Sequence, residues 1–391
     1  QNFLALINRW VLDILSQSTG QAFIGAGQIS SDNLIAILAN AAVAVGIFLL
    51  LRQDWQAKPS GELFAETRRL YRYVWLVYAL ALALLGTQQV FHFLFLVGLP
   101  DSGVGEVEFA NGLSLALTGI PLWVFVRSIV TRSWQDPSEQ ESLLRRIVIF
   151  LVIMAGAFGG LVGSAGLLNA VLFFVLRLIS GAGPDGQALW GDAGEALAIL
   201  LPYAAVWFYH QSILRQDLLL PPGLQDAERD NIARFSSPAL RRSGLRRTYL
   251  YLLALLGLAW TLIGITGFLT TLVTLLAGRA PGLDVATIRG LTETLSAALV
   301  GLPVWITSWR LAQLEAAVEG EAGDHAWRSL VRRGFIYLAL IVGLAGVMVG
   351  AGLLFFNLFS AALGNDAEDL LTDVLQSVHV IVLYALVLVY H

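Results

Sequence analysis

Apolar and polar stretches alternate along this chain in a fixed order. A pair of arginines precedes a long apolar run, a short acidic loop follows, and a second apolar run comes after the loop. The order occurs four times, beginning at Arg68-Arg69, Arg145-Arg146, Arg246-Arg247 and Arg332-Arg333. Each apolar run has at least the roughly 20 residues that a helix needs to cross bilayer hydrocarbon. The pattern therefore predicts a tandem array of transmembrane helical hairpins.

We expect an all-α, polytopic transmembrane bundle of two-helix hairpins with about ten membrane segments. The predicted segments are 3–15, 33–52, 70–97, 111–131, 146–180, 194–214, 247–277, 290–310, 333–362 and 373–391. The first helix of each complete hairpin should be longer than the bilayer requires, so it should tilt or protrude. The polar connectors between hairpins are too short to form a soluble domain.

Two kinds of hairpin alternate. The first kind, the A hairpin, begins with Arg-Arg-x-Tyr-x-Tyr at residues 68 and 246, and its second helix carries Gly-x-Pro-x-Trp at 119 and 301. The second kind, the B hairpin, carries Tyr-Ala-x-Val-x-x-Tyr-His at 203 and 384. One A and one B hairpin make a four-helix module, and an even number of crossings gives parallel repeats.

This repeat predicts the division of the chain. We expect a partial module at 1–53, four-helix membrane modules at 68–216 and 241–391, and a cytoplasmic linker at 217–240. Asn8 matches Asn357 and, less closely, Asn169, which places residue 1 inside a B hairpin. We therefore expect the chain to be a fragment of a longer protein with at least one A hairpin before residue 1.

Composition supports a membrane protein. The chain is 57% hydrophobic and 13% charged, whereas soluble domains carry about 25% charged residues. A net charge of −4 gives no basic face for nucleic acid. The chain has 0 cysteines, which excludes disulfides and thiolate metal sites. Motifs for metal binding, phosphate binding or nucleophilic catalysis are also missing, so we expect no cofactor and no enzymatic activity.

The distribution of charge predicts an orientation. Most of the lysines and arginines lie in the connectors and at their flanks, whereas the loops inside the hairpins carry acidic residues such as Asp101, Glu108, Asp185, Asp192 and Asp366. Positive residues stay on the cytoplasmic side because they resist translocation. We expect a multi-pass protein of the inner (plasma) membrane, with cytoplasmic connectors and acidic loops outside.

The arginine pairs have two interpretations. Arg68, Arg69, Arg145, Arg146, Arg246, Arg247, Arg332 and Arg333 are candidates for contacts with anionic lipid headgroups, or they only set the topology and extend to the interface. The neighbouring Tyr71, Tyr73, Tyr249 and Tyr251, with Trp55, Trp134, Trp309 and Trp327, suggest an aromatic belt at headgroup level. A ligand cage is the alternative.

Three prolines lie inside predicted second helices. Pro121, Pro202 and Pro303 are candidate helix-break positions, because each proline removes a helical hydrogen bond. Such breaks line substrate sites in transporters, and in packed bundles they are ordinary kinks. Closely spaced glycines, including Gly156, Gly159 and Gly346, favour close packing of helices within the chain, with a partner-binding seam as the alternative.

The pattern of Arg-Arg-x-Tyr-x-Tyr, the acidic outer loop and Gly-Leu-Pro-Val-Trp at 301–305 resembles a bacterial multi-pass membrane-protein family known only as a domain of unknown function. The resemblance covers both modules and implies four helices for each domain. It implies no activity, ligand or catalytic residue.

Two functions remain. The first is a non-enzymatic scaffold or accessory subunit of a larger membrane assembly, in contact with membrane lipids and with other membrane proteins or copies of itself. The second is a transporter or channel for a small solute or lipid. No buried ionisable group appears at the centre of a predicted helix, which disfavours an ion-coupled carrier.

Overall fold

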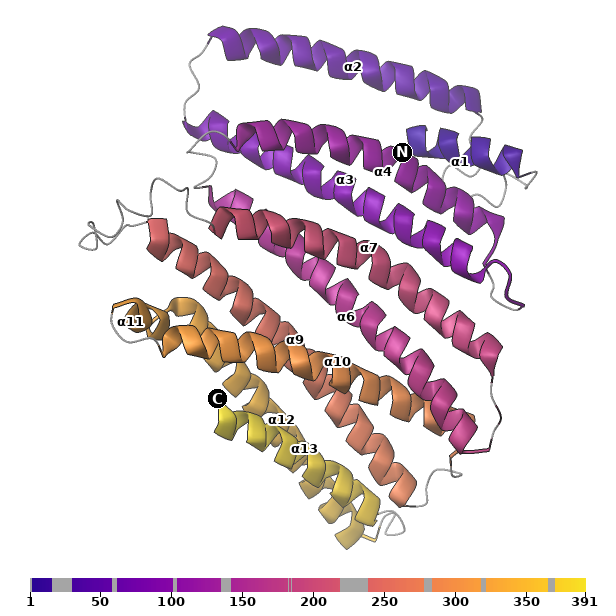
Figure 1. Ribbon diagram of the computed structural model, residues 1–391, viewed down its shortest axis with the longest axis vertical. Helices are drawn as coiled ribbons and strands as arrows, with labels where there is room; N and C mark the ends of the chain where they lie inside the picture. The colour runs from indigo at the N-terminus through magenta and orange to yellow at the C-terminus, as the bar shows by residue number, and fades with distance from the viewer. Residues whose placement is uncertain are drawn as a thin grey trace. The chain divides into compact units, whose positions relative to one another are not determined.

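The computed structural model describes residues 2–15, 30–57, 62–100, 104–134, 142–181, 183, 185–218, 238–277, 283–317, 321–364 and 370–391. Within this part of the chain all regular structure is helical (Figure 1). The helices are α1 (Asn2–Ile14), α2 (Ser30–Ala57), α3 (Glu62–Leu96), α4 (Glu106–Ser133), α6 (Leu143–Ile179), α7 (Gly186–Leu218), α9 (Pro238–Leu276), α10 (Val285–Ala316), α11 (Glu321–Trp327), α12 (Leu330–Ala362) and α13 (Leu370–Tyr390).

Eight of these helices are long and apolar enough to cross a membrane. They are α3, α4, α6, α7, α9, α10, α12 and α13, which pair in sequence as four hairpins, and α2 holds a shorter apolar stretch, Ser31–Val43. The predicted all-α multi-pass architecture is therefore confirmed.

The first helix of every complete hairpin is the longer one, as expected. α9 has 39 residues and α10 has 32, and α12 has 33 against 21 in α13. At about 1.5 Å per residue, α9 exceeds the roughly 30 Å of bilayer hydrocarbon. It begins at Pro238, ahead of Arg246 and Arg247, so part of the excess length lies at the arginine end.

Aspartate side chains cap the second helices α7 and α10. The carboxylate of Asp284 accepts a hydrogen bond from the backbone N–H of Thr287 at 2.8 Å, at the start of α10. Asp185 accepts one from Ala188 at 2.9 Å, at the start of α7. Caps of this kind satisfy backbone donors that have no partner in the first turn, so they help to fix where α7 and α10 begin, whereas α4 begins after Gly105 without a side-chain cap.

Glycines let the two helices of each A hairpin touch through their backbones. A methyl group added at Gly86 would overlap the backbone of Ala116, and one added at Gly119 would overlap that of Ala83. The α9–α10 hairpin repeats both contacts, between Gly264 and Ala298 and between Gly301 and Thr261. Close approach of this kind drives helix association in lipid, where the hydrophobic effect between helices is absent.

In the B hairpins an aromatic ring also packs against glycine. A methyl group at Gly159 of α6 would overlap the ring of Tyr203 on α7, and one at Gly346 of α12 would overlap the ring of Tyr384 on α13. Both tyrosines open the Tyr-Ala-x-Val-x-x-Tyr-His motif. The predicted packing of helices within the chain is therefore confirmed for these glycines.

The chain forms two compact units. Unit 1 contains residues 1–160 and 197–210, and unit 2 contains 161–196 and 211–391. In unit 1, α1 packs on α4, and the Asn8 side-chain amide donates to Asn111 Oδ1 at 2.6 Å. In unit 2, Arg289 of α10 lies over the Phe173 ring of α6 at 4.5 Å. Helices of both types of hairpin thus meet inside each unit.

The predicted linker at 217–240 falls largely on residues 219–237, outside the described part of the chain. The connector at 312–331 does have structure. α10 continues to Ala316, and the short helix α11 covers Glu321–Trp327. Sequence reasoning missed α11, because its seven residues, six of them polar or small and the last a tryptophan, give no helical apolar pattern.

Candidate functional site

In the A hairpins the two arginines of each pair take different roles. In the pair that begins the membrane part of α9, the Arg247 side chain is 9% exposed and the Arg246 side chain is 54% exposed. In α3, Arg69 is partly buried and Arg68 is exposed. Consecutive helical residues point about 100° apart, so one arginine reaches into the protein and the other reaches outward.

The B hairpins show the same division in reverse order. Arg145 is buried and Arg146 is half-buried at the start of α6, while Arg332 is half-buried and Arg333 is exposed at the start of α12. The inward-facing arginine is therefore the second of the pair in the A hairpins and the first in the B hairpins. Only the outward-facing members remain simple candidates for headgroup contacts.

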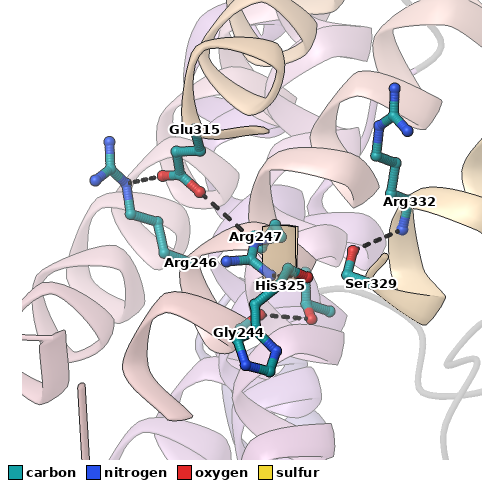
Figure 2. A network of polar contacts seen from close by, with 8 residues as sticks. Gly244, Arg246, Arg247, Glu315, His325, Ser329 and Arg332 are labelled. Atoms are coloured by element: carbon teal, nitrogen blue, oxygen red, sulfur yellow. Dashed lines mark hydrogen bonds and ion pairs between the residues drawn. The ribbon is translucent and has the colours of Figure 1, made fainter. Parts of the chain in front are cut away.

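In unit 2 the inward-facing arginine of α9 joins three elements (Figure 2). Arg247 Nη1 donates to the carbonyl oxygen of His325 on α11 at 3.1 Å. Its Nε lies 3.9 Å from the carboxylate of Glu315 on α10, which also lies 2.9 Å from Nε of Arg246. This network ties α11 to the arginine end of the α9–α10 hairpin.

Tryptophans cover the inward-facing arginines of the B hairpins. The Arg332 guanidinium lies 3.7 Å from the ring centroid of Trp327, and the Ser329 side chain caps its backbone N–H at 3.3 Å (Figure 2). The Arg145 guanidinium lies 4.8 Å from the ring centroid of Trp134. Such contacts stabilise a cation that has lost part of its water.

The prediction of an aromatic belt is wrong for most of the tyrosines that follow the arginine pairs. Tyr73 and Tyr251 are only 1% and 2% exposed, and Tyr249 and Trp309 are also buried. They belong to the protein core, because hairpins pack around them. Tyr71 and Trp327 are exposed, as a belt requires. The side chain of Trp55 is not among those that the structure describes.

The motifs of the A and B hairpins meet inside each unit. Trp123 and Tyr209 lie edge to face in unit 1, and Trp305 and Tyr390 do so in unit 2, both with ring centroids 5.7 Å apart. In unit 1 the Arg127 guanidinium lies 4.6 Å from the Tyr209 ring centroid. In unit 2 the equivalent residue is Trp309, which stacks on Phe335 at 4.7 Å.

The three prolines do not share one environment. Pro121 of α4 and Pro303 of α10 are exposed, whereas Pro202 of α7 is buried. An exposed position on a membrane helix faces lipid or a partner. The proposal that these breaks line a substrate site remains a prediction.

Amide side chains in the spans bond across helices. Gln376 of α13 donates to Thr274 of α9 at 3.1 Å, and Asn357 of α12 donates to Ser377 of α13 at 3.4 Å. His379 Nε2 lies 3.3 Å from the Thr270 hydroxyl. The contacts of Gln376 and His379 form a polar seam between α9 and α13, whereas that of Asn357 lies within the α12–α13 hairpin.

The opposite end of unit 2 pairs its charges. Arg177 lies 2.8 Å from Asp185, and Arg289 lies 3.4 Å from Asp192. The hydrogen bond from the Ala188 backbone N–H, followed by Arg177, holds the pKa of Asp185 below its usual range. Hydrogen bonds from Thr287 do the same for the pKa of Asp284. The predicted outer-loop residues Asp101 and Asp366 lie outside the described residues.

Sequence reasoning missed Glu315, Phe173 and Arg289, because their roles depend on partners far away in the chain. Across the described side chains, His, Asp and Glu nowhere gather in the groups of three that could hold a metal ion. At the end of the hairpins that bears the arginine pairs, positive charge lies beside exposed apolar surface.

Comparison with known proteins gives a family for the chain. The model of the family described as Domain of unknown function (DUF5671) matches residues 69–205 and again 247–387. The two matches agree with the tandem modules that the repeated motifs indicate. Neither the curated proteins nor the solved structures gave a match. Because the matched residues make up most of its length, the chain belongs to this family and carries two copies of the DUF5671 domain.

Proposed function

We propose that the protein is a non-enzymatic scaffold or accessory subunit of a larger membrane assembly. The observation that carries this proposal is the backbone-to-backbone packing inside the A hairpins, at Gly86, Gly119, Gly264 and Gly301. Helices in such contact leave no room for a solute between them. They suit a rigid element that holds other molecules in place.

The polar groups inside the hairpins support the same proposal. The Thr261 hydroxyl donates to the carbonyl of Gly257 at 2.7 Å, and the Ser296 hydroxyl donates to that of Thr292 at 2.6 Å. Hydroxyls that bond to their own helix offer little to a passing solute. In a carrier, hydroxyl groups of this kind would have to face the path that the solute takes through the membrane.

We further propose that the protein resides in a bacterial inner membrane with its connectors in the cytoplasm. Support comes from the charge of unit 2, where arginines gather at the end bearing Arg247 and Arg332, while Asp185 and Asp284 cap helices at the other end. Positive residues favour the cytoplasmic side. Its partners would be membrane lipids and other membrane proteins or further copies of itself, and not nucleic acid.

A transporter or channel for a small solute or lipid is the second candidate. It is favoured by the polar seam of Thr270, Thr274, Gln376 and His379 between α9 and α13. Polar residues within spans often mark a path through the membrane. In the scaffold the same residues simply join the two hairpins.

The two candidates predict different outcomes for one preparation. The protein is extracted gently from its own membrane, cross-linked, and its neighbours are identified by mass spectrometry, while a second portion is placed in liposomes for solute-flux assays. A scaffold should give a reproducible stoichiometric partner and no flux above empty liposomes. A single species without partner, together with flux that Gln376→Leu abolishes, would establish the transporter instead.

A further inference from the structure

The turn before α12 and its first residues combine exposed cations with exposed apolar side chains. Arg328 and Arg333 are exposed, and neither guanidinium has an acidic partner among the described residues. Leu330, between them, is 83% exposed, and Trp327 is also exposed. In water such apolar exposure would be costly, so this segment fits the boundary between headgroups and acyl chains.

Arg333 lies at the unfavourable end of α12, whereas Arg328 directly follows the last residue of α11. The first turn of α12 contains no acidic residue, and a helix N-terminus carries a partial positive charge. Cations there raise the electrostatic free energy unless an anion lies beside them. Glu315 is engaged with the arginines of α9. Among the described residues Asp324 makes no ion pair with Arg328 or Arg333, so an anion from outside the chain would be favoured here.

An apolar stripe continues from Arg333 along α12. Tyr337, Ile341, Leu344 and Met348 are all exposed, and spacings of three and four residues place them on one face of the helix. Tyr337 lies one turn from Arg333 and carries a hydroxyl. The cations, the hydroxyl and the apolar stripe therefore follow one another along the helix. A phospholipid has its phosphate, its ester groups and its acyl chains in the same order.

We propose that this face of α12 binds one anionic phospholipid. Arg328 and Arg333 hold its phosphate, the Tyr337 hydroxyl donates to the phosphate or an ester oxygen, and an acyl chain lies along Ile341 and Met348. The apolar stripe favours a lipid over a free anion, which would gain nothing from it. This inference goes beyond the scaffold role and does not depend on it.

The first module provides a comparison within the chain. Its equivalent residues are Arg146, which is half-buried, and Phe150, which has no hydroxyl. The same helix face in the first module therefore lacks the donor that Tyr337 supplies. We expect α12 to bind the anionic lipid more tightly than α6.

The test is a lipid titration of the detergent-solubilised protein, read by native mass spectrometry. The probes are phosphatidylglycerol, which is anionic, and phosphatidylcholine, which is not. Arg328→Gln/Arg333→Gln should weaken phosphatidylglycerol binding by about 25-fold, since each basic residue near a membrane surface contributes about fivefold. Arg289→Gln removes one charge at the opposite end of unit 2, and we expect a change of less than about twofold.

A second variant separates binding from folding. Tyr337→Phe copies the first module and should weaken phosphatidylglycerol binding by about fivefold, the value of one hydrogen bond, with an unchanged thermal unfolding curve. Three results would each overturn the proposal. They are equal affinities of the double variant and the parent protein, equal binding of the two lipids, and displacement of phosphatidylglycerol by millimolar inorganic phosphate, which would assign the site to a free anion.

Discussion

Trp305 and Tyr390 lie edge to face with ring centroids 5.7 Å apart, so the second helix of the A hairpin contacts the second helix of the B hairpin. Trp123 and Tyr209 make the same contact at the same centroid distance. Each pair joins the two sequence motifs that define the module. The four-helix repeat is therefore a structural unit as well as a sequence repeat, because the motif of the A hairpin contacts the motif of the B hairpin.

This contact predicts a loss of stability. Trp305→Leu keeps apolar bulk but removes the aromatic pair, so the free energy of unfolding should fall by about 1 kcal/mol. Thermal unfolding in detergent measures the change. Trp190→Leu is the matched control, because Trp190 is exposed, and it should leave the midpoint unchanged. Equal effects of the two variants would show that the ring contact contributes nothing.

The glycine contact of the second B hairpin gives another prediction. In Gly346→Ala the added methyl overlaps the Tyr384 ring, and we expect a destabilisation of about 1–3 kcal/mol from overpacking. Gly352→Ala on the same helix has open space around it, so greater helix propensity should make that variant neutral or slightly more stable. Comparing the two unfolding midpoints in one detergent checks both. A Gly346→Ala protein as stable as the parent would mean that α12 and α13 are not in close contact.

The two arginines at the start of the membrane part of α9 should differ when each is replaced. Arg247→Gln leaves the half-buried Glu315 less well paired and removes the hydrogen bond to His325, so about 2 kcal/mol of stability should be lost. Arg246→Gln removes an ion pair whose arginine side chain is 54% exposed, so it should cost less than about 1 kcal/mol. Chemical unfolding of both variants gives the comparison, and the reverse ranking would contradict the inward placement of Arg247.

When the pH is lowered, the first turns of α7 and α10 should lose protection from hydrogen exchange before the rest of these helices. The pKa values of Asp185 and Asp284 lie below the ordinary value of 3.8 in the folded protein. A lowered folded pKa means that each carboxylate stabilises the fold above the unfolded pKa and that this contribution is lost as the pH falls through the folded pKa. Hydrogen exchange at Thr287 and Ala188 should therefore accelerate below about pH 4, beyond the intrinsic change in rate.

Asp284→Asn is the control for this effect. Asparagine still accepts the capping hydrogen bond but does not titrate. Protection at Thr287 should persist in this variant and lose its extra dependence on pH. If the parent protein and the variant respond identically to acid, the cap is not the titrating group.

Much of the fold could be predicted because its information is local. The apolar run between Arg246 and Leu276, for example, is so long that it indicates a membrane-spanning helix. α11 could not be found this way, since its order depends on Arg247 reaching His325 from another helix. Tertiary contacts override local propensity in such short elements.

The site was harder to predict than the fold. The arginine pairs were visible in the sequence, yet their division into inward and outward members depends on which helix face meets a neighbour. Tyr251 looked like an interfacial residue because it follows arginines, and it is buried because Trp309 and Phe335 enclose its ring. Adjacency in the sequence cannot distinguish a headgroup contact from a core contact.

The central claim is that the hairpins cross a membrane with the arginine ends on the cytoplasmic side and the acidic loops outside. Because the chain has 0 cysteines, single cysteines can be placed at four glycines with open surroundings, Gly105 and Gly186 at the acidic loops and Gly244 and Gly334 at the arginine ends. Intact cells are treated with a membrane-impermeant thiol reagent. We expect labelling at 105 and 186 only, with 244 and 334 labelled after lysis. Labelling at 244 or 334 in intact cells, or equal labelling at all four positions, would contradict the account.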